Sequence, residues 1–123
     1  MNIVLWIVQG LLALLYLAIG AVKASQPIPR LSKRLPWVTA LPPAQVRAIG
    51  VAEALGGIGI VLPLATGILP WLTPTAAGGL VIIQVAAAVF HTARGEYATL
   101  RGNIVLLILA AFVLFGRTVL IPA

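Results

Sequence analysis

Residues 47–63 read RAIGVAEALGGIGIVLP, an apolar and glycine-rich run that carries one acidic residue, Glu53, about two helical turns from its charged end. A helix of this length crosses most of a bilayer core, because each residue advances the helix by about 1.5 Å. A carboxylate at that depth is costly unless it faces protein or water and has a partner. We therefore take Glu53 as the centre of the candidate functional site and search the rest of the chain for its partners.

The composition indicates a membrane protein. The 123 residues are 62% hydrophobic and 8% charged, and a soluble domain of this size could not bury so much apolar surface. The net charge of +6 does not indicate nucleic-acid binding, because the basic residues stand at the ends of hydrophobic runs. The absence of cysteine excludes thiolate catalysis, thiolate metal sites and disulfide exchange. No basic residue precedes the first apolar run, so we expect no cleavable signal peptide.

Four apolar segments predict four membrane helices, at about residues 3–23, 43–63, 74–94 and 103–120. Thr73-Pro74 is typical of a helix start, with Thr73 as the N-cap. Polar and small residues recur on one face of each segment, mostly at a spacing of seven. These sets are Gln9, Tyr16 and Lys23; Gly50, Glu53, Ala54 and Gly57; Ala77, Gln84 and His91; and Asn103, Ala110 and Arg117. The sequence thus predicts an all-α fold, one integral membrane domain over residues 1–123, in which the four helices form an antiparallel four-helix bundle with these faces inward.

Residues 24–42 form the longest connection, and their four prolines forbid a continuous helix. The mixture of basic and apolar residues suits a segment that lies at the headgroup level over one mouth of the bundle. A solvated basic loop that only sets the orientation is the alternative. Most basic residues lie in or beside the first and third connections, namely Lys23, Arg30, Lys33, Arg34, Arg47, Arg94 and Arg101. The positive-inside rule predicts that these connections are cytoplasmic and that both termini lie outside the cytoplasm.

A polar core is predicted at one depth in the cytoplasmic half, where side chains from all four helices converge. A buried carboxylate is stabilised by a nearby cation, and Lys23, His91 and the arginines are available to Glu53. Two interpretations stay open. Glu53 and His91 form a protonatable pair that binds a small polar molecule, a quinone head group or protons, or the cluster is a structural lock between helices. The candidate ligand-binding or polar-core residues are Lys23, Arg47, Glu53, Gln84, His91 and Asn103, with Arg94 at the same level.

The remaining polar residues have simpler expected roles. Gln9 and Tyr16 are expected to form hydrogen bonds between helices. We expect Arg117 to extend toward the opposite membrane surface and Trp71 to anchor the second connection at the interface. One histidine with one carboxylate falls short of an ordinary metal site, so we expect no metal.

Several short motifs occur in a fairly specific order and spacing. They are Gly20-Ala21-Val22-Lys23, the pattern Arg47-x-x-Gly50-x-x-Glu53-x-x-Gly56, Leu72-Thr73-Pro74 followed by Ala76-Ala77, His91 with Glu96, and Asn103 with Gly116-Arg117. With these motifs nearly the whole chain resembles the DoxX-like family of small four-helix membrane proteins. That family takes its name from a membrane subunit associated with a quinone-linked oxidoreductase that oxidises thiosulfate. The resemblance implies the bundle fold, the bacterial inner membrane and a shared polar core of Lys23, Arg47, Glu53 and His91. Some relatives carry cysteines suited to thiol chemistry, which this chain lacks.

The function expected from these features is that of an accessory or ligand-binding subunit in a quinone-linked or stress-related redox assembly. No nucleotide or haem motif is present, so we expect no autonomous catalysis and no intrinsic cofactor, but a dissociable quinone as the candidate ligand. The expected partners are membrane lipid, proteins of a redox complex and a second copy of the chain, and no nucleic acid. The alternative is a small oligomeric proton-coupled transporter or channel that uses Glu53. A third hypothesis, an isomerase-like membrane enzyme, needs Glu53 and His91 for acid–base chemistry and a cavity for the substrate.

Overall fold

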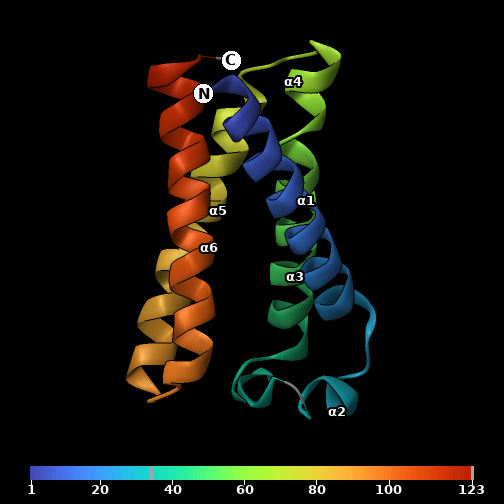
Figure 1. Ribbon diagram of the computed structural model, residues 1–123. Helices are drawn as coiled ribbons and strands as arrows, with labels where there is room; N and C mark the ends of the chain where they lie inside the picture. Colours follow the sequence, from blue (N-terminus) through green and yellow to red (C-terminus); the bar gives the residue numbers. More distant parts are fainter. Residues whose placement is uncertain (34, 123) are drawn as a thin grey trace.

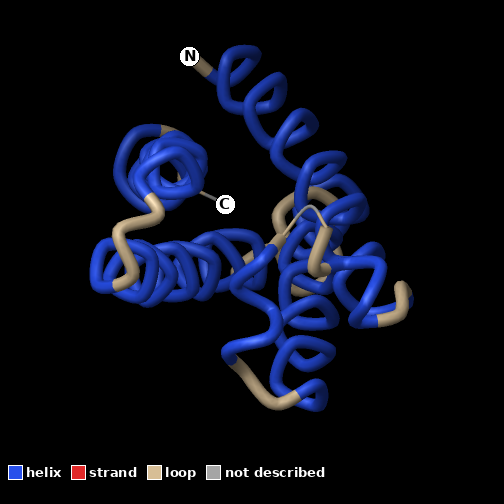
Figure 2. The backbone as a smooth tube through the Cα atoms, turned by 90° about the horizontal axis from the view of Figure 1, so that it is seen from below, coloured by secondary structure: helices blue, strands red, loops and turns tan. Residues whose placement is uncertain are grey.

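The computed structural model describes residues 1–33 and 35–122, so Arg34 of the first connection lies outside the described residues. The described part is made of helices and loops and contains no strand (Figures 1 and 2). Four helical segments, packed antiparallel, are long and apolar enough to cross a membrane. These segments are Asn2–Ser25, Pro43–Thr66, Leu72–Ala93 and Tyr97–Leu120. The protein is therefore a multi-pass membrane protein. Both termini lie at one end of the bundle, called here the terminal end, and the opposite end, with Lys23, Arg47 and Arg94, is called the basic end (Figure 1).

Helices α1 (Asn2–Ser25) and α3 (Pro43–Gly59) cross at glycines. A Cβ atom on Gly50 would lie 2.7 Å from the carbonyl oxygen of Gly20 and 2.7 Å from the amide nitrogen of Ala24. No side chain fits between the two backbones there, in the manner of small-residue interfaces between membrane helices. Of the face predicted to point inward on α3, Gly50, Glu53 and Gly57 are buried and Ala54 is half-buried, and Val46 is buried as well. The predicted close packing around the carboxylate is therefore confirmed.

The second span is not one straight helix. Helix α3 ends at Gly59, and a separate short helix, α4 (Leu62–Thr66), follows after a turn at residues 60–61. The prediction of a continuous helix over residues 43–63 is corrected here. Pro63 explains the break, because proline has no N–H for the i−4 bond and its ring would clash with the carbonyl of Gly59.

Helices α5 (Leu72–Ala93) and α6 (Tyr97–Phe115) form the second pair, and a π-helical turn, η2 (Gly116–Leu120), continues α6. Two predicted starts were wrong. Helix α5 begins after Trp71, so Thr73 is not its N-cap and lies buried inside the first turn. Helix α6 begins six residues before Asn103, since Gly95, with φ of +71°, ends α5 and Glu96 follows at once as the N-cap residue of α6.

The first connection covers the basic end of the bundle. It contains a short helix, α2 (Ile28–Leu31), and a 3-10 turn, η1 (Pro36–Ala40). Leu31, Trp37 and Val38 are buried in one cluster with Val46 of α3, whereas the basic residues Arg30 and Lys33 are exposed. The connection is therefore a packed cover with a charged outer surface, and not a loose solvated loop.

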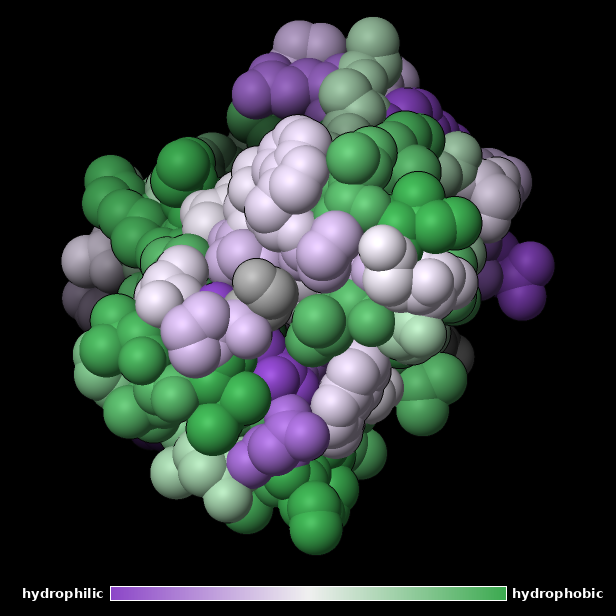
Figure 3. Space-filling view, turned by 90° about the horizontal axis from the view of Figure 1, so that it is seen from above, coloured by the Kyte–Doolittle hydropathy of each residue, from purple (hydrophilic) through white to green (hydrophobic). Residues whose placement is uncertain are grey.

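The main apolar core holds the four spans together nearer the terminal end. It consists of Leu12, Tyr16, Ile60, Ala77, Leu80, Ala110 and Val113. Seen from that end, hydrophobic residues alternate with residues of intermediate hydropathy, and hydrophilic groups appear below the middle and at the upper and right edges of the view (Figure 3). Toward the basic end the α1/α3 pair and the α5/α6 pair diverge (Figure 1). The candidate site lies between these two pairs.

Candidate ligand-binding site

A cavity lies between the two helix pairs, in the half of the bundle toward the basic end. It has two lobes of about 390 and 400 Å³, which fall in the size range of natural ligand pockets, about 300–1,000 Å³. One lobe extends between α1 and α6, along Ile19, Val22 and Leu106. The other extends between α3 and α5, along Ile49, Ile83 and Phe90. Both lobes share six residues: Lys23, Trp37, Glu53, Gln84, His91 and Asn103. Five of these six are predicted polar-core residues.

Glu53 is paired with Lys23. The Lys23 Nζ atom lies 2.7 Å from Glu53 Oε1, and the side chains are only 13% and 2% exposed. Lys23 also lies 5.2 Å from the centre of the Trp37 ring, within range of a cation–π interaction. One ammonium thus neutralises the carboxylate at the α1–α3 crossing. Glu53 is fixed in the cavity wall by this bond.

Arg47 lies outside the cavity lining. Its Nη1 atom donates a hydrogen bond of 2.7 Å to the backbone carbonyl of Lys23. That carbonyl is in the last turn of α1, where carbonyl groups lack helical partners and a cation is favourable. Arg47 therefore caps α1 and holds the Lys23 backbone in place, and its contact with the rest of the predicted polar core is indirect.

Gln84 and Asn103 form a second polar pair in the cavity wall. Asn103 Nδ2 donates to Gln84 Oε1 at 2.7 Å and so links α6 to α5. Gln84 is 2% exposed. This pair and the pair of Lys23 and Glu53 line the same two lobes.

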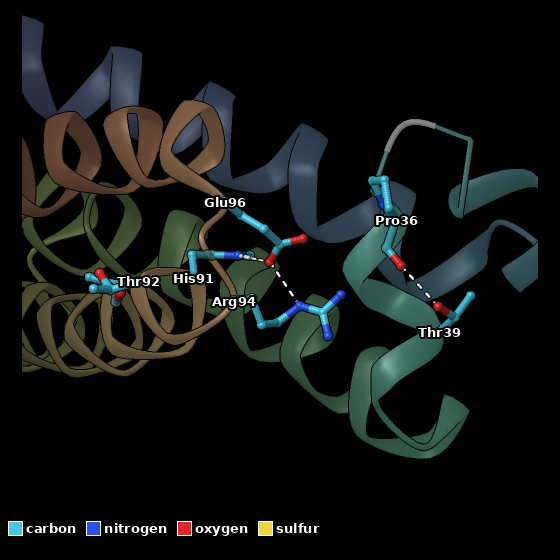
Figure 4. Close-up of polar contacts among 7 residues, drawn as sticks. Pro36, Thr39, His91, Thr92, Arg94 and Glu96 are labelled. Atoms are coloured by element: carbon cyan, nitrogen blue, oxygen red, sulfur yellow. Dashed lines mark hydrogen bonds and ion pairs between the residues drawn. The ribbon is translucent and has the colours of Figure 1, made fainter.

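His91 lies at the end of α5 and is bonded away from Glu53. Its Nδ1 atom is 2.9 Å from Glu96 Oε1, and Arg94 Nε donates to the same oxygen at 3.0 Å (Figure 4). His91 is 3% exposed, and its ring packs edge-on against the rings of Trp37 and Phe90, with centroid distances of 5.6 and 5.3 Å. Glu53 and His91 therefore line one cavity without forming the direct pair that the sequence suggested.

Glu96 stays ionised near neutral pH. The hydrogen bond from His91 and the Arg94 guanidinium hold the pKa of its carboxyl group below the usual value. An ionised carboxylate only accepts hydrogen bonds, so His91 must carry its proton on Nδ1. When the imidazole is neutral, its other nitrogen, Nε2, is consequently an unprotonated acceptor.

Three polar atoms at or near the cavity are buried without a hydrogen-bond partner in the described part of the chain: Tyr16 Oη, Trp37 Nε1 and Asn103 Oδ1. Trp37 and Asn103 line both lobes. The Tyr16 hydroxyl lies near Gln84 but makes no bond of ordinary geometry, so the predicted interhelical bond of Tyr16 is absent. Buried polar groups left unpaired cost about 1–3 kcal/mol each. A bound molecule with one acceptor and one donor would satisfy Trp37 and Asn103.

A second polar cluster, around Arg117, lies at the terminal end. Arg117 is 3% exposed, and it donates to Gln9 Oε1 at 2.7 Å and to Asn2 Oδ1 at 2.8 Å. Its guanidinium also lies 5.2 Å from the centre of the Trp6 ring. Gln9 in turn donates to the backbone carbonyl of Ile60 at 2.5 Å, which confirms its interhelical role. The prediction that Arg117 extends to the membrane surface was wrong, because Gln9 and Asn2 of α1 hold its Nε and Nη1 atoms inside the bundle, while Nη2 is buried without a partner among the described residues.

A model of the DoxX-like family matches residues 7–113 of the chain. The chain belongs to the DoxX-like family. The matched range of this DoxX-like protein includes all six residues shared by the two lobes, and it ends before Arg117. No curated protein and no protein of known structure is significantly similar to the chain. Within residues 1–33 and 35–122, no three His, Asp or Glu side chains are grouped closely enough to hold a metal ion.

Proposed function

We propose that this DoxX-like membrane protein is a ligand-binding subunit that holds a dissociable quinone-type molecule for a redox assembly of the bacterial inner membrane. The observation that carries the proposal is the two-lobed cavity with its unpaired polar atoms. Trp37 Nε1 offers a donor and Asn103 Oδ1 an acceptor, both buried and both in the wall shared by the lobes. A quinone carbonyl can accept from Trp37 Nε1, and the hydroxyl group of the reduced, hydroquinone form can donate to Asn103 Oδ1.

The two lobes support a ligand with an apolar part. Their walls are mostly aliphatic and aromatic beyond the shared polar residues, as in many sites for small molecules. Each lobe lies between helices of different pairs, α1 and α6 or α3 and α5. An apolar tail could therefore leave the cavity between helices and enter the lipid, while the head group stays at Trp37 and Asn103.

The proposed orientation places the basic end in the cytoplasm. The exposed residues Arg30, Lys33 and Arg101, with Arg94, belong to that end, and an excess of Lys and Arg is typical of cytoplasmic connections. Both termini would then lie outside the cytoplasm. In this orientation the head group of the ligand sits in the cytoplasmic half of the bilayer.

A proton-coupled transporter that uses Glu53 is less well supported. Such a role requires a carboxylate that gains and loses protons during transport, whereas Glu53 is held at 2.7 Å by the Lys23 ammonium. In the structure this carboxylate is occupied by its ion pair with Lys23. A binding role needs no such exchange at Glu53.

The test is a titration of the protein in detergent or nanodiscs with decylubiquinone as the probe. Quenching of Trp37 fluorescence measures the binding. Trp6→Phe and Trp71→Phe remove the other two tryptophans. We expect saturable quenching. Ala87→Phe, which fills the α3–α5 lobe lined by Ala87, should weaken binding at least about tenfold. Ala111→Phe is the matched control, because Ala111 is exposed on α6 and lines neither lobe. Quenching that does not saturate, or that is equal in Ala87→Phe and Ala111→Phe, would refute the proposal.

A further inference from the structure

Two titratable side chains, those of Glu53 and His91, line the cavity, and they differ in where their bonding partners lie. Glu53 is neutralised by Lys23 at 2.7 Å inside the bundle. His91 is bonded to Glu96, a residue of the connection between α5 and α6 that is 19% exposed. His91 is therefore the one that connects the cavity to a group at the surface of the basic end.

The contacts of His91 fix its tautomer. Nδ1 lies 2.9 Å from an oxygen of Glu96, and the guanidinium of Arg94 keeps that carboxylate ionised and oriented (Figure 4). With Nδ1 as the donor, Nε2 has a free lone pair. Among the described residues the His91 ring is hydrogen-bonded through Nδ1 and not through Nε2, and His91 lines both lobes.

We propose that His91 and Glu96 form a proton route between the cavity and the surface of the basic end, used by a bound molecule that carries a weakly acidic O–H group. The proposal rests on the proposed ligand-binding function and names the chemical class of the ligand. A hydroquinone or phenol meets the requirement, since its O–H can donate to His91 Nε2.

The transfer balances in protons and charge. The ligand O–H bond breaks and its proton binds His91 Nε2, while the Nδ1 proton passes to Glu96 and then to water. The electron pair of the broken bond stays on the ligand oxygen. Lys23 lines the same cavity, where its ammonium is shared with Glu53. The reverse sequence delivers a proton from water to a ligand anion and restores the first tautomer.

The other elements packed around His91 offer no competing route. Helix α1 contributes Lys23 and α3 contributes Glu53, which are bonded to each other. The turn η1 contributes Trp37, whose ring packs on His91, and α6 contributes the amide of Asn103. Asn103 Oδ1 can accept a hydrogen bond but is not a base, so among the described residues that line the cavity His91 is the base positioned to take a ligand proton.

The experiment combines NMR and binding, and it uses 2-decylhydroquinone and its dimethyl ether as probes. The chain has one histidine, so a protein labelled with ¹⁵N-histidine gives unambiguous ring signals. We expect an Nδ1–H tautomer with bare Nε2 in the free protein, and a shift of the Nε2 signal with the hydroquinone but not with the ether. The hydroquinone should bind at least about tenfold more tightly than the ether. In His91→Phe, which keeps an aromatic ring between Trp37 and Phe90, the hydroquinone and the ether should bind about equally.

The outcomes separate the two proposals. An Nε2–H tautomer in the free wild-type protein overturns the proton route, and this measurement needs no variant that must fold. Equal binding of hydroquinone and ether, with both lost in Ala87→Phe, overturns the route and leaves the binding function standing. Absence of saturable binding by either probe overturns both. Glu96→Gln gives a further check, because loss of the anionic acceptor should make the Nε2–H tautomer more abundant.

Discussion

Replacing Lys23 with methionine would leave the most deeply buried carboxylate of the chain without its cation. Lys23→Met keeps the length and the apolar stem of the side chain but removes the ammonium 2.7 Å from Glu53, whose side chain is 2% exposed. Breaking one partner of a buried ion pair costs about 3–5 kcal/mol. The equilibrium between folded and unfolded protein should therefore shift by about 10²- to 10⁴-fold. Far-UV circular dichroism during SDS titration in mixed micelles measures this shift.

A double-mutant cycle separates the pair from the side chains themselves. Glu53→Gln alone should cost less than Lys23→Met, because Lys23 is 13% exposed and its long side chain can reach the surface. Lys23→Met combined with Glu53→Gln should recover at least about 2 kcal/mol of the loss, since no buried charge then remains unpaired. A loss below about 1 kcal/mol in Lys23→Met, with no coupling in the cycle, would refute the assignment of a dry, buried ion pair.

Three further predictions concern packing, the terminal cluster and pH. Gly50→Val should destabilise the protein by about 1–3 kcal/mol or more, because even the Cβ atom of the new side chain would lie 2.7 Å from backbone atoms of α1. Gly102 has open space around it, so Gly102→Ala should be neutral or stabilising by up to about 1 kcal/mol in the same SDS titration. Arg117→Met should cost about 2–3 kcal/mol. Arg117→Lys should not restore it fully, since its single nitrogen does not reproduce the two separate positions of Nε and Nη1 that bind Gln9 and Asn2. The hydrogen bond from His91 lowers the pKa of Glu96. The contribution of this bond to stability should therefore be complete above the usual glutamate pKa of about 4.3 and be lost as the pH falls through the lower pKa of the folded state. When stability is measured against pH, this change on the acid side should be missing in Glu96→Gln.

The inward faces of the helices were predictable because burial follows the helical period. Gln9, Tyr16, Gln84 and His91 recur at a spacing of seven within their segments, and all four are buried. The wide spacing of polar residues in an apolar chain leaves few alternatives for the inward face. The same reasoning predicted the small residues beside Glu53, and Gly50 indeed meets the backbone of α1.

The partners of the polar groups were not predictable from spacing alone. Counting residues gives the depth of a side chain but not the rotation of one helix against another, which depends on contacts such as that between Gly20 and Gly50. Lys23 and His91 lie at a similar depth in the sequence-based count, so both were candidate partners of Glu53. The crossing of α1 and α3 brings Lys23 within bonding distance of Glu53. A local partner five residues away, Glu96, binds His91 instead.

Arg117 shows a different reason for a missed contact. A single arginine near a membrane surface is expected to extend outward when no acid lies nearby. Here Arg117 lies in a π-helical turn, and neutral acceptors on α1, Gln9 and Asn2, bind its Nε and Nη1 atoms. The shared period of Asn103, Ala110 and Arg117 was the signal that favoured an inward position.

Native mass spectrometry of the protein purified from its membranes tests most directly whether the cavity holds a dissociable molecule. The wild-type chain should carry a small-molecule adduct that dissociates on activation. The adduct should be retained in Ala111→Phe and lost in Ala87→Phe, where the new ring occupies the lobe between α3 and α5. An adduct retained equally by both variants, or no adduct in any of the three proteins, would contradict the assignment of this cavity as a ligand-binding site.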